Sequence, residues 1–366
     1  MPTVLNADFS GTPTSGYLPR NVHFTDQSTG PIDQWSWAFG DGNTSSVPSP
    51  QYTYPDAGSY TVILTVTNTT YGITSTATKV KYIHVLSFAE YVSNESVFVY
   101  GTKLVFRGYT INGENSTIVF MGPLLSTELD GGAKINVSKI YVDGDADLGA
   151  SNIALGYQPQ PGNTYIHGYL KSQANLYGEV NVAGDATLTG AKIHGNVSVD
   201  GDLTVDDWKP TFDSNSYIYY TGSLITPGGD NSRCIHVDTL PGFTIPDLPL
   251  PSTKAQAWYD ARGYVSGGTL TSNLKVFADS ITSDSWRPSA YNVVIVARTG
   301  DITLTGLGGS TVSGVLFAPN GQVTFYGGAF EGVVIARDGF YVTSGGTTVR
   351  FKNMDEYISD SADYPF

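Results

Sequence analysis

The chain has 366 residues, of which 40% are hydrophobic and 14% are charged, and its 33 acidic and 19 basic residues give a net charge of −14 at pH 7. This composition is too apolar and too aromatic for a disordered chain, and the acidic excess repels phosphate backbones, so nucleic acid is not an expected partner. Glycine, tyrosine, threonine, serine and valine abound while helix formers are scarce, which predicts an all-β protein.

Features related to export are mixed. Cys234 is the only cysteine, so no disulfide can form within the chain. The first residues, MPTVLNADFS, lack the basic and apolar regions of a signal peptide, and no long apolar run follows, so we expect no membrane insertion within this chain. Either a leader or membrane anchor was removed, or the protein reaches its destination without one, as virion proteins do. Six N-x-Ser/Thr sequons permit glycosylation outside a cell: Asn43, Asn68, Asn94, Asn115, Asn136 and Asn196.

The N-terminal region, residues 1–88, carries the pattern of a β-sandwich. Trp35 and Trp37 alternate with polar residues, which predicts a strand with both rings on one face, and the glycines of FGDG predict a turn after it. Tyr60, Val62, Leu64 and Val66 alternate again. Two half-buried strands on either side of a turn are typical of a sandwich. We expect Asp41 of FGDG to cap its own turn with its carboxylate.

These residues resemble the PKD (polycystic kidney disease) type domain, an immunoglobulin-like sandwich, over about residues 5–85. The matching stretches are ADFSG, VHFTDQSTG, WSWAFGDG and QYTYPDAGSYTV, in the order and spacing of that family. The resemblance implies an extracellular spacer or interaction module. Two interpretations of the aromatic residues remain: Trp37 and Tyr60 fill the core, which we favour, or Trp35 and Tyr54 bind sugar or protein.

The second region, residues 89–366, contains a short repeat. The segments VIVARTGDITLTG, VLFAPNGQVTFYG and VVIARDGFYVTSG align with Ala297, Ala318 and Ala336 in register, about 20 residues apart. This period is too short for a βαβ unit or a propeller blade and fits one turn of a parallel β-helix. The alignment predicts an interior ladder of Val296, Phe317 and Ile335, with glycines at the corners. These repeats resemble the right-handed β-helices of bacterial and archaeal surface and pilus-associated proteins.

Earlier segments continue the repeat. Gly144, Gly184 and Gly201 are each followed by aspartate and a strand-like run, and IHG recurs at 166–168 and 193–195. Residues 206–290 are predicted to form an irregular insertion because prolines cluster there. Within it, Ser252 is expected to cap a helix through Trp258 to about Arg262, which lies across the coil or plugs one end.

Candidate chemical sites are few. Asp143, Asp145 and Asp147 occupy alternating positions, so they could bind calcium with help from Asp200 and Asp202, although such Gly-Asp segments are also common solvated turns. Calcium is the one cofactor for which the sequence offers a pattern. His167 and His194 fall at equivalent places in the two IHG repeats, and we expect a structural role for both. Cys234 and His236 would share a strand face, yet we expect a buried cysteine beside an unrelated histidine.

The leading hypothesis is therefore a non-enzymatic protein of the cell surface with a structural or adhesive role. Expected partners are other surface proteins, surface carbohydrate, or the protein itself through head-to-tail stacking of the coil. One alternative is a polysaccharide-active β-helix enzyme that uses Asp143, Asp145 and Asp185, or a carbohydrate-binding protein. The other alternative is a virion fibre or spike protein.

Overall fold

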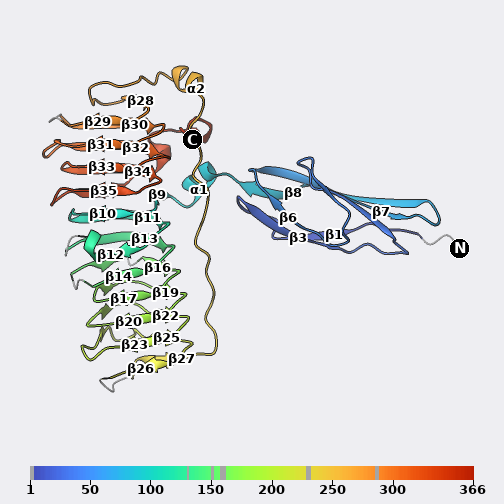
Figure 1. The fold of residues 1–366 in the computed structure, drawn as a ribbon, viewed down its shortest axis with the longest axis horizontal. Helices are drawn as coiled ribbons and strands as arrows, with labels where there is room; N and C mark the ends of the chain where they lie inside the picture. Colours follow the sequence, from blue (N-terminus) through green and yellow to red (C-terminus); the bar gives the residue numbers. More distant parts are fainter. Residues whose placement is uncertain (1–3, 130–131, 150–151, 157–161, 228–231, 285–287) are drawn as a thin grey trace. The chain divides into compact units, whose positions relative to one another are not determined.

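The computed structural model describes residues 4–129, 132–149, 152–156, 162–227, 232–284 and 288–366 (Figure 1). The chain divides into two compact units, Met1–Tyr91 and Val92–Phe366, which are considered separately. The sequence had placed this boundary at residue 88. The division falls inside the first helix, α1, Phe88–Asn94.

The first unit is the predicted β-sandwich. One sheet has the order β1-β3-β6 and the other the order β2-β8-β7-β4-β5. Trp37 of β4 is opposite Leu64 of β7, and both are fully buried between the sheets with Phe9 and Tyr54. The strands are β1 Phe9–Thr12, β2 Ser15–Tyr17, β3 Arg20–Asp26, β4 Gln34–Ala38, β5 Thr44–Ser45, β6 Gln51–Tyr54, β7 Gly58–Asn68 and β8 Ile73–Leu86.

The second unit is a parallel β-solenoid of about 11 turns, as the repeat predicted. Its turns stack in three columns of parallel strands, which we call faces 1, 2 and 3. Face 1 contains β29 Ile281–Ser283, β31 Ile302–Leu304, β33 Val323–Phe325, β35 Phe340–Val342 and β10 Leu104–Phe106, and below them β12 Leu124–Leu125, β14 Ala146–Leu148, β17 Leu170–Ser172, β20 Ala186–Leu188, β23 Leu203–Val205 and β26 Leu224–Ile225.

Long strands run through both face 2 and face 3: β30 Ala290–Ala297, β32 Thr311–Ala318, β34 Ala329–Ala336, β11 Thr110–Phe120 and β13 Lys134–Val142. Face 2 also contains β36 Thr348–Phe351, β15 Ala154–Leu155, β18 Asn175–Leu176, β21 Lys192–Ile193 and β24 Thr211–Phe212. Face 3 also contains β28 Lys275–Ala278, β9 Val97–Gly101, β16 Asn163–Ile166, β19 Val180–Val182, β22 Val197–Val199, β25 Ile218–Tyr220 and β27 Cys234–His236.

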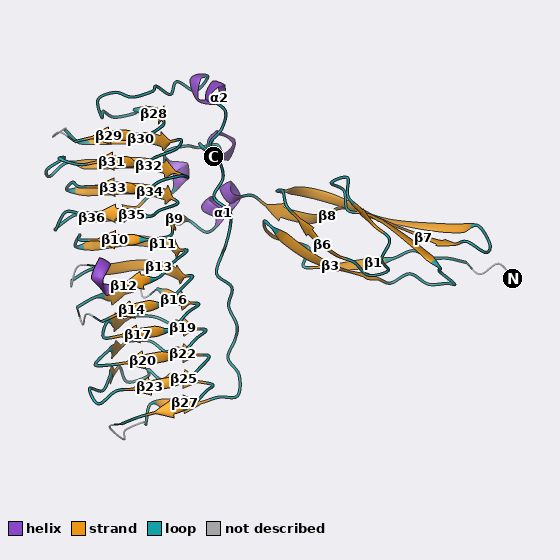
Figure 2. Cartoon of the chain, viewed as in Figure 1, coloured by secondary structure: helices purple, strands orange, loops and turns teal. Residues whose placement is uncertain are grey.

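The turns do not stack in the order of the sequence. From β9 the chain winds to β27 at one end, crosses to the other end through residues 237–255, which we call the strap, and then winds back from β28 to β36 (Figures 1 and 2). Strand β36 lies between β34 and β11, and β34 also pairs with β9. One turn of the solenoid is therefore built from β36 and from β9 and β10, which lie at opposite ends of the unit's sequence.

This arrangement corrects the predicted insertion at residues 206–290. Its first part, through β24 to β27, forms regular turns, and the irregular part is the strap together with α2, Gln256–Asp260, and the residues that lead to β28. Helix α2 is shorter than predicted and begins after Ala255 with no side-chain cap, so Ser252 does not cap it. Tyr259 holds α2 against the solenoid, because its ring stacks on that of Phe277 of β28 at 3.7 Å.

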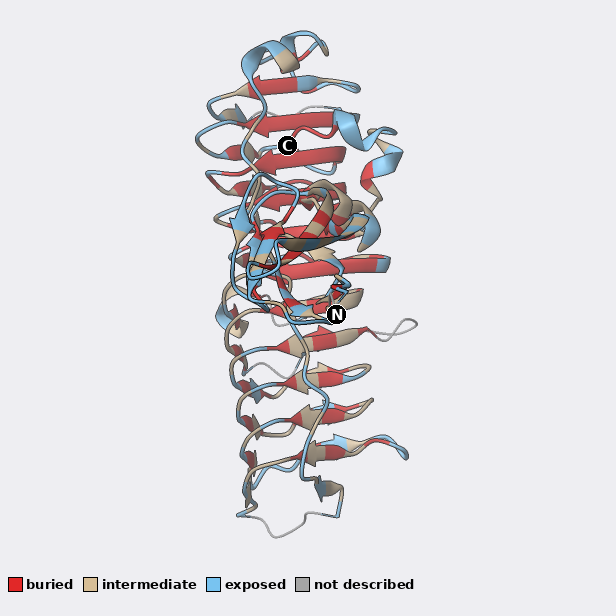
Figure 3. Cartoon of the chain, turned by 90° about the vertical axis from the view of Figure 1, so that its right-hand side faces the viewer, coloured by how far each residue is buried: buried red, intermediate tan, exposed pale blue. Residues whose placement is uncertain are grey.

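The interior of the solenoid is a column of mostly aliphatic side chains. In Figure 3 the strands of the solenoid are coloured as buried along much of their length. Ala297, Ala318 and Ala336, which the repeat aligns in register, belong to this column. The ladder of Val296, Phe317 and Ile335 exists in the predicted register but points away from this column. It is nevertheless fully buried, and the ring of Phe317 contacts that of the C-terminal Phe366 at 5.2 Å. The prediction of an interior ladder was therefore wrong by one residue.

Candidate functional site

The Gly-Asp pairs stand at the corner between face 3 and face 1. The Oδ1 atoms of Asp145, Asp185 and Asp202 accept hydrogen bonds from backbone N–H groups of the next turn, those of Tyr169 at 3.1 Å, Asp202 at 2.8 Å and Ser223 at 2.6 Å. Asp301 accepts the N–H of Gln322 in the same way at 2.9 Å. Backbone donors at a corner lose their ladder partners, and the carboxylates replace them. The repeated aspartates therefore join one turn to the next.

The glycines of these pairs confirm the predicted corners. Gly144, Gly168, Gly184, Gly201 and Gly222 follow one another from turn to turn, and a Cβ at Gly184 would lie 2.8 Å from the carbonyl oxygen of Gly168. A side chain would therefore collide with the neighbouring corner. Two turns separate Gly144 from Gly184, with Gly168 at the corner between them.

The structure does not bring Asp143, Asp145 and Asp147 together as ligands. The chain turns at Gly144, so alternation along one strand does not hold across these residues. Asp143 contacts Nδ1 of His167 at 2.8 Å, and Asp147 lies 3.7 Å from Nζ of Lys171. Within the described ranges, no three His, Cys, Asp or Glu side chains are grouped so that they could hold a metal ion. Asp200, the suggested further ligand, accepts the hydroxyl of Thr221 at 2.9 Å.

The two IHG segments are not equivalent. Ile166 pairs with Val182 on face 3, whereas Ile193 pairs with Leu176 on face 2, so that alignment was wrong. His167 is exposed beside Asp143. The ring of His194 stacks on Tyr177 at 4.1 Å and its Nδ1 lies 3.1 Å from Asp213. Local sequence identity at a corner does not reveal which corner it occupies.

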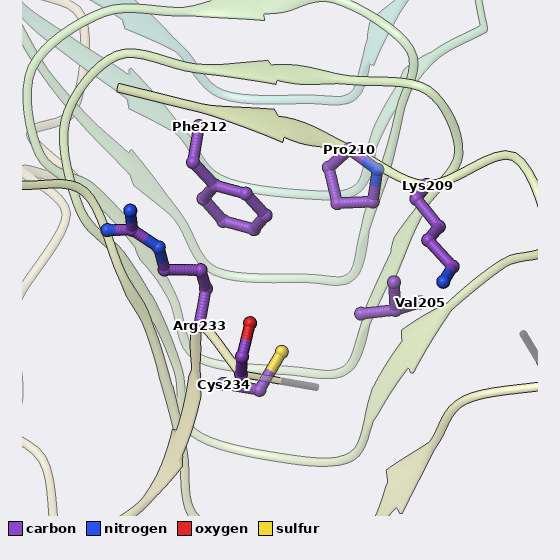
Figure 4. Close-up of a pocket in the computed structure, with 7 residues that line it drawn as sticks. Val205, Lys209, Pro210, Phe212, Arg233 and Cys234 are labelled. Atoms are coloured by element: carbon purple, nitrogen blue, oxygen red, sulfur yellow. The ribbon is translucent and has the colours of Figure 1, made fainter. Parts of the chain in front are cut away.

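Cys234 and His236 lie on β27, at the lower end of the solenoid. Cys234 is half-buried and packs against the interior column, and Nε2 of His236 lies 3.2 Å from the carbonyl oxygen of Thr221. A cavity of about 80 Å³ opens here between Cys234, Phe212 and Lys209 (Figure 4). It has room for only a few water molecules. Its apolar lining is the last layer of the interior column.

In the sandwich, Tyr54 is fully buried and donates its hydroxyl to the carbonyl oxygen of Phe39 at 3.0 Å, so it belongs to the core and not to a binding surface. Trp37 fills the core as expected, whereas Tyr60 is only partly buried. Trp35 is also partly buried, and its Nε1 donates to Asp26 at 2.6 Å. Core packing therefore explains the most buried of these rings.

Asp41 caps its turn as predicted, accepting the backbone N–H of Asn43 at 3.0 Å and the hydroxyl of Tyr52 at 2.5 Å. Partial burial of the Asp41 carboxylate opposes its ionisation, but the hydrogen bonds from Tyr52 and Asn43 outweigh this and lower its pKa. Burial of the phenol, followed by its bond to Asp41, raises the pKa of Tyr52 to about 12. This group stabilises a turn and contacts no cavity that we identify as a site.

The sequons differ in how accessible their amides are. Asn68 is buried, and its side chain bonds to the carbonyl oxygen of Pro31 and to the N–H of Tyr71. The amides of Asn43, Asn136 and Asn196 donate to neighbouring side chains, whereas Asn94 and Asn115 are exposed. Glycosylation remains a prediction, and Asn94 and Asn115 are the sites at which it would cost the fold least.

A second cavity, of about 210 Å³, lies between face 3 and the strap. We call it the strap cleft. Asn181 and Ser198 line it from the sheet, His167 and Asp200 from the adjoining corner, and Pro241 to Phe243 from the strap. Sequence reasoning missed it entirely, because the strap reaches this face only through the crossing from one end of the solenoid to the other. No local signal in residues 237–255 indicates that crossing.

Among the residues that the structure describes, no helix combines the length and the hydrophobicity needed to span a membrane. Comparison with curated proteins finds a microbial collagenase of Vibrio alginolyticus that is 26% identical over 192 residues. The match covers 47% of this chain and 22% of the collagenase, so it spans less than a quarter of that protein.

Among solved structures, the chain is similar to the PKD1 domain of the Vibrio cholerae metalloprotease PrtV, at 31% identity over 22% of this chain and 96% of that domain, with a TM-score of 0.20. It is also similar to a structure of carbohydrate-binding modules from the β-sandwich superfamily, at 32% identity over 23% of this chain and 35% of that one, with a TM-score of 0.21. A family model described as PKD domain matches residues 3–85. The first unit of this chain is therefore a PKD domain.

Proposed function

We propose that this chain is an extracellular protein of a cell surface with a structural or adhesive role and no catalysis of its own. The observation that carries the proposal is that the acidic residues bind neighbouring turns of the solenoid. The carboxylates that could have formed a catalytic pair, Asp143, Asp145 and Asp185, each bind a group of an adjacent turn. They hold the solenoid together as a stiff support.

The PKD domain supports the extracellular part of the proposal, because its family resemblance implies a spacer or interaction module. End-to-end stacking of chains is not part of the proposal. The upper edge of face 3 is already paired, since the N–H of Val265 bonds to the carbonyl oxygen of Lys275 at 3.0 Å and the N–H of Phe277 bonds to that of Val265 at 2.9 Å. Stacking on that edge would have to displace these bonds.

Two measurements test the proposal. Antibodies against the folded chain should label intact cells of the source organism, and a deletion strain should lose the label together with normal attachment or envelope morphology. Label on lysed cells only, or on purified virions, would contradict it. In parallel, the protein is incubated with polygalacturonate and with neutral polysaccharides. We expect no new reducing ends or unsaturated products, and the appearance of either would establish the enzyme alternative.

A further inference from the structure

The strap lies on face 3 through aromatic contacts. The hydroxyl of Tyr100 donates to the carbonyl oxygen of Leu248 at 2.8 Å and accepts the N–H of the same residue at 3.0 Å. Farther down, the ring of Phe243 packs on that of Tyr165 at 5.4 Å. These two contacts fix the strap above the sheet at separate turns. Between and beside these two contacts, the outward side chains of face 3 determine how much space remains under the strap.

Below Tyr165, the outward side chains of face 3 change from aromatic to small and polar. Tyr141 and Tyr165 are in register and their rings stack at 5.0 Å. The next two positions in the same register are Asn181 and Ser198, and Tyr219 follows. Two small polar side chains therefore replace aromatic ones for two turns, which leaves a recess roughly 10 Å long at the usual strand spacing. The strap segment Pro241–Phe243 covers this recess and forms the strap cleft.

The polar side chains that line the cleft from the sheet are available for hydrogen bonds to a ligand. Within the described part of the chain, neither the Asn181 amide nor the Ser198 hydroxyl has a hydrogen-bond partner, although both are partly buried. Neither group is among the fully buried side-chain atoms that lack a partner, so both still contact water, which a bound solute would replace. A solute that carries both donors and acceptors would satisfy them, since an amide and a hydroxyl each donate and accept.

The remaining lining narrows the class of ligand. Phe243 offers an aromatic face on the strap side, against which the C–H face of a sugar ring can pack. Asp200 and His167 supply further acceptors and donors at the rim, and no lysine or arginine is among the described residues that line the cleft. The carboxylate of Asp200 at the rim and the net charge of −14 disfavour anions such as uronates or phosphates. The volume of about 210 Å³ is smaller than that of sites for drug-sized molecules, which run from roughly 300 Å³.

We propose that the strap cleft binds one residue of a neutral sugar, with Asn181 and Ser198 bonding its hydroxyls and Phe243 packing on its ring. This goes beyond the proposed function: a surface protein could lack the site, and the site could exist whatever the location of the protein. The ligand lies outside the solenoid, so binding requires no change in the stack of turns.

The test uses the full chain and two cleft variants. Asn181→Tyr fills the recess with a residue that the register already accepts at Tyr165 and Tyr219, and Phe243→Ala removes the aromatic face together with the strap's contact to Tyr165. The matched control is Thr187→Tyr, which places the same side chain at an outward position of face 1, between Lys171 and Thr204. Thermal unfolding verifies that each variant folds. Binding of cellobiose, lactose, mannobiose, chitobiose and digalacturonic acid is measured by isothermal titration and by saturation-transfer NMR.

We expect at least one neutral disaccharide to bind the wild-type chain and the Thr187→Tyr control equally. Each cleft variant should weaken that binding about tenfold or more, which corresponds to about 1.4 kcal/mol. Digalacturonic acid should not bind. The proposal is overturned if no neutral probe binds the wild-type chain, if the cleft variants bind as well as the control, or if the acidic disaccharide binds as tightly as the neutral ones. None of these outcomes changes the surface-labelling result, so the two proposals fail separately.

Discussion

The order of turns in the solenoid can be tested by crosslinking. Asn112 of β11 and Arg350 of β36 are register partners on adjacent strands, although they lie near opposite ends of the second unit's sequence. We consider the double substitution Asn112→Cys and Arg350→Cys in a background in which the single native cysteine is removed by Cys234→Ser. Both positions lie on the outer side of the strands, since their neighbours Ile111 and Val349 are buried in the interior column.

The expected separation follows from the stacking. Adjacent strands are about 4.8 Å apart, which lies within the Cα separation of about 4.4–6.8 Å that a disulfide tolerates. If the turns stacked in sequence order, the two positions would be about ten turns apart, or roughly 50 Å, and no disulfide could form. In the chain-entropy account, a crosslink that closes a loop of more than 100 residues stabilises by about 4–5 kcal/mol, which raises the thermal midpoint by on the order of 10 °C.

Oxidation is followed by non-reducing electrophoresis and by mass spectrometry of the disulfide-linked tryptic peptide. Glu331→Cys with Arg350→Cys is the positive control, because these residues are partners and are adjacent in either order of turns. Asn112→Cys with Thr282→Cys is the negative control, since Thr282 lies on β29 at the far end of face 1. A positive control that crosslinks while the pair at 112 and 350 does not would refute the observed order.

Three further predictions follow from local contacts. Gly314→Ala should destabilise the solenoid by about 2–5 kcal/mol in denaturant unfolding, because its φ is +149° and a Cβ would collide with the backbone of Val293 on the preceding turn. Gly242→Ala, with open space around it, should cost little, and equal effects of the two substitutions would contradict this. Asp202→Ala should cost about 1 kcal/mol through the lost bond to the Ser223 N–H, and Asp202→Asn, which keeps an acceptor oxygen, should cost less. The raised pKa of Tyr52, about 12, means that its contribution to stability is complete below the unfolded-state pKa of about 10 and is lost as pH rises through 12. Tyr52→Phe should therefore lose less stability between pH 10 and pH 12 than the wild-type chain, and a thermal midpoint that falls as steeply in both would sink the assignment.

Some features of the fold could be read from local sequence because they depend on near neighbours. The alternation around Trp37 predicts a strand with a buried face, and the structure buries that ring completely. The Gly-Asp pairs at Gly144 and Gly201 predict corners, because only glycine tolerates the close approach of adjacent turns. The chemical role of these aspartates was less apparent. A carboxylate in a turn can bind calcium, act as an acid or accept a backbone N–H, and only the position of the next turn decides among them.

The sequence by itself determined the all-β class, the period of about 20 residues, the sandwich and the corners. Tertiary structure alone decided the order of the turns, the path of the strap and which alternate residues face inward. The physical reason is that every turn offers equivalent backbone edges above and below, so hydrogen bonding does not specify which turn stacks on which. Likewise, Val296 and Ala297 are both apolar, and which of them lies in the column depends on what covers the other side. The strap cleft depends on these non-local features, because the strap and the outward side chains of face 3 form it together.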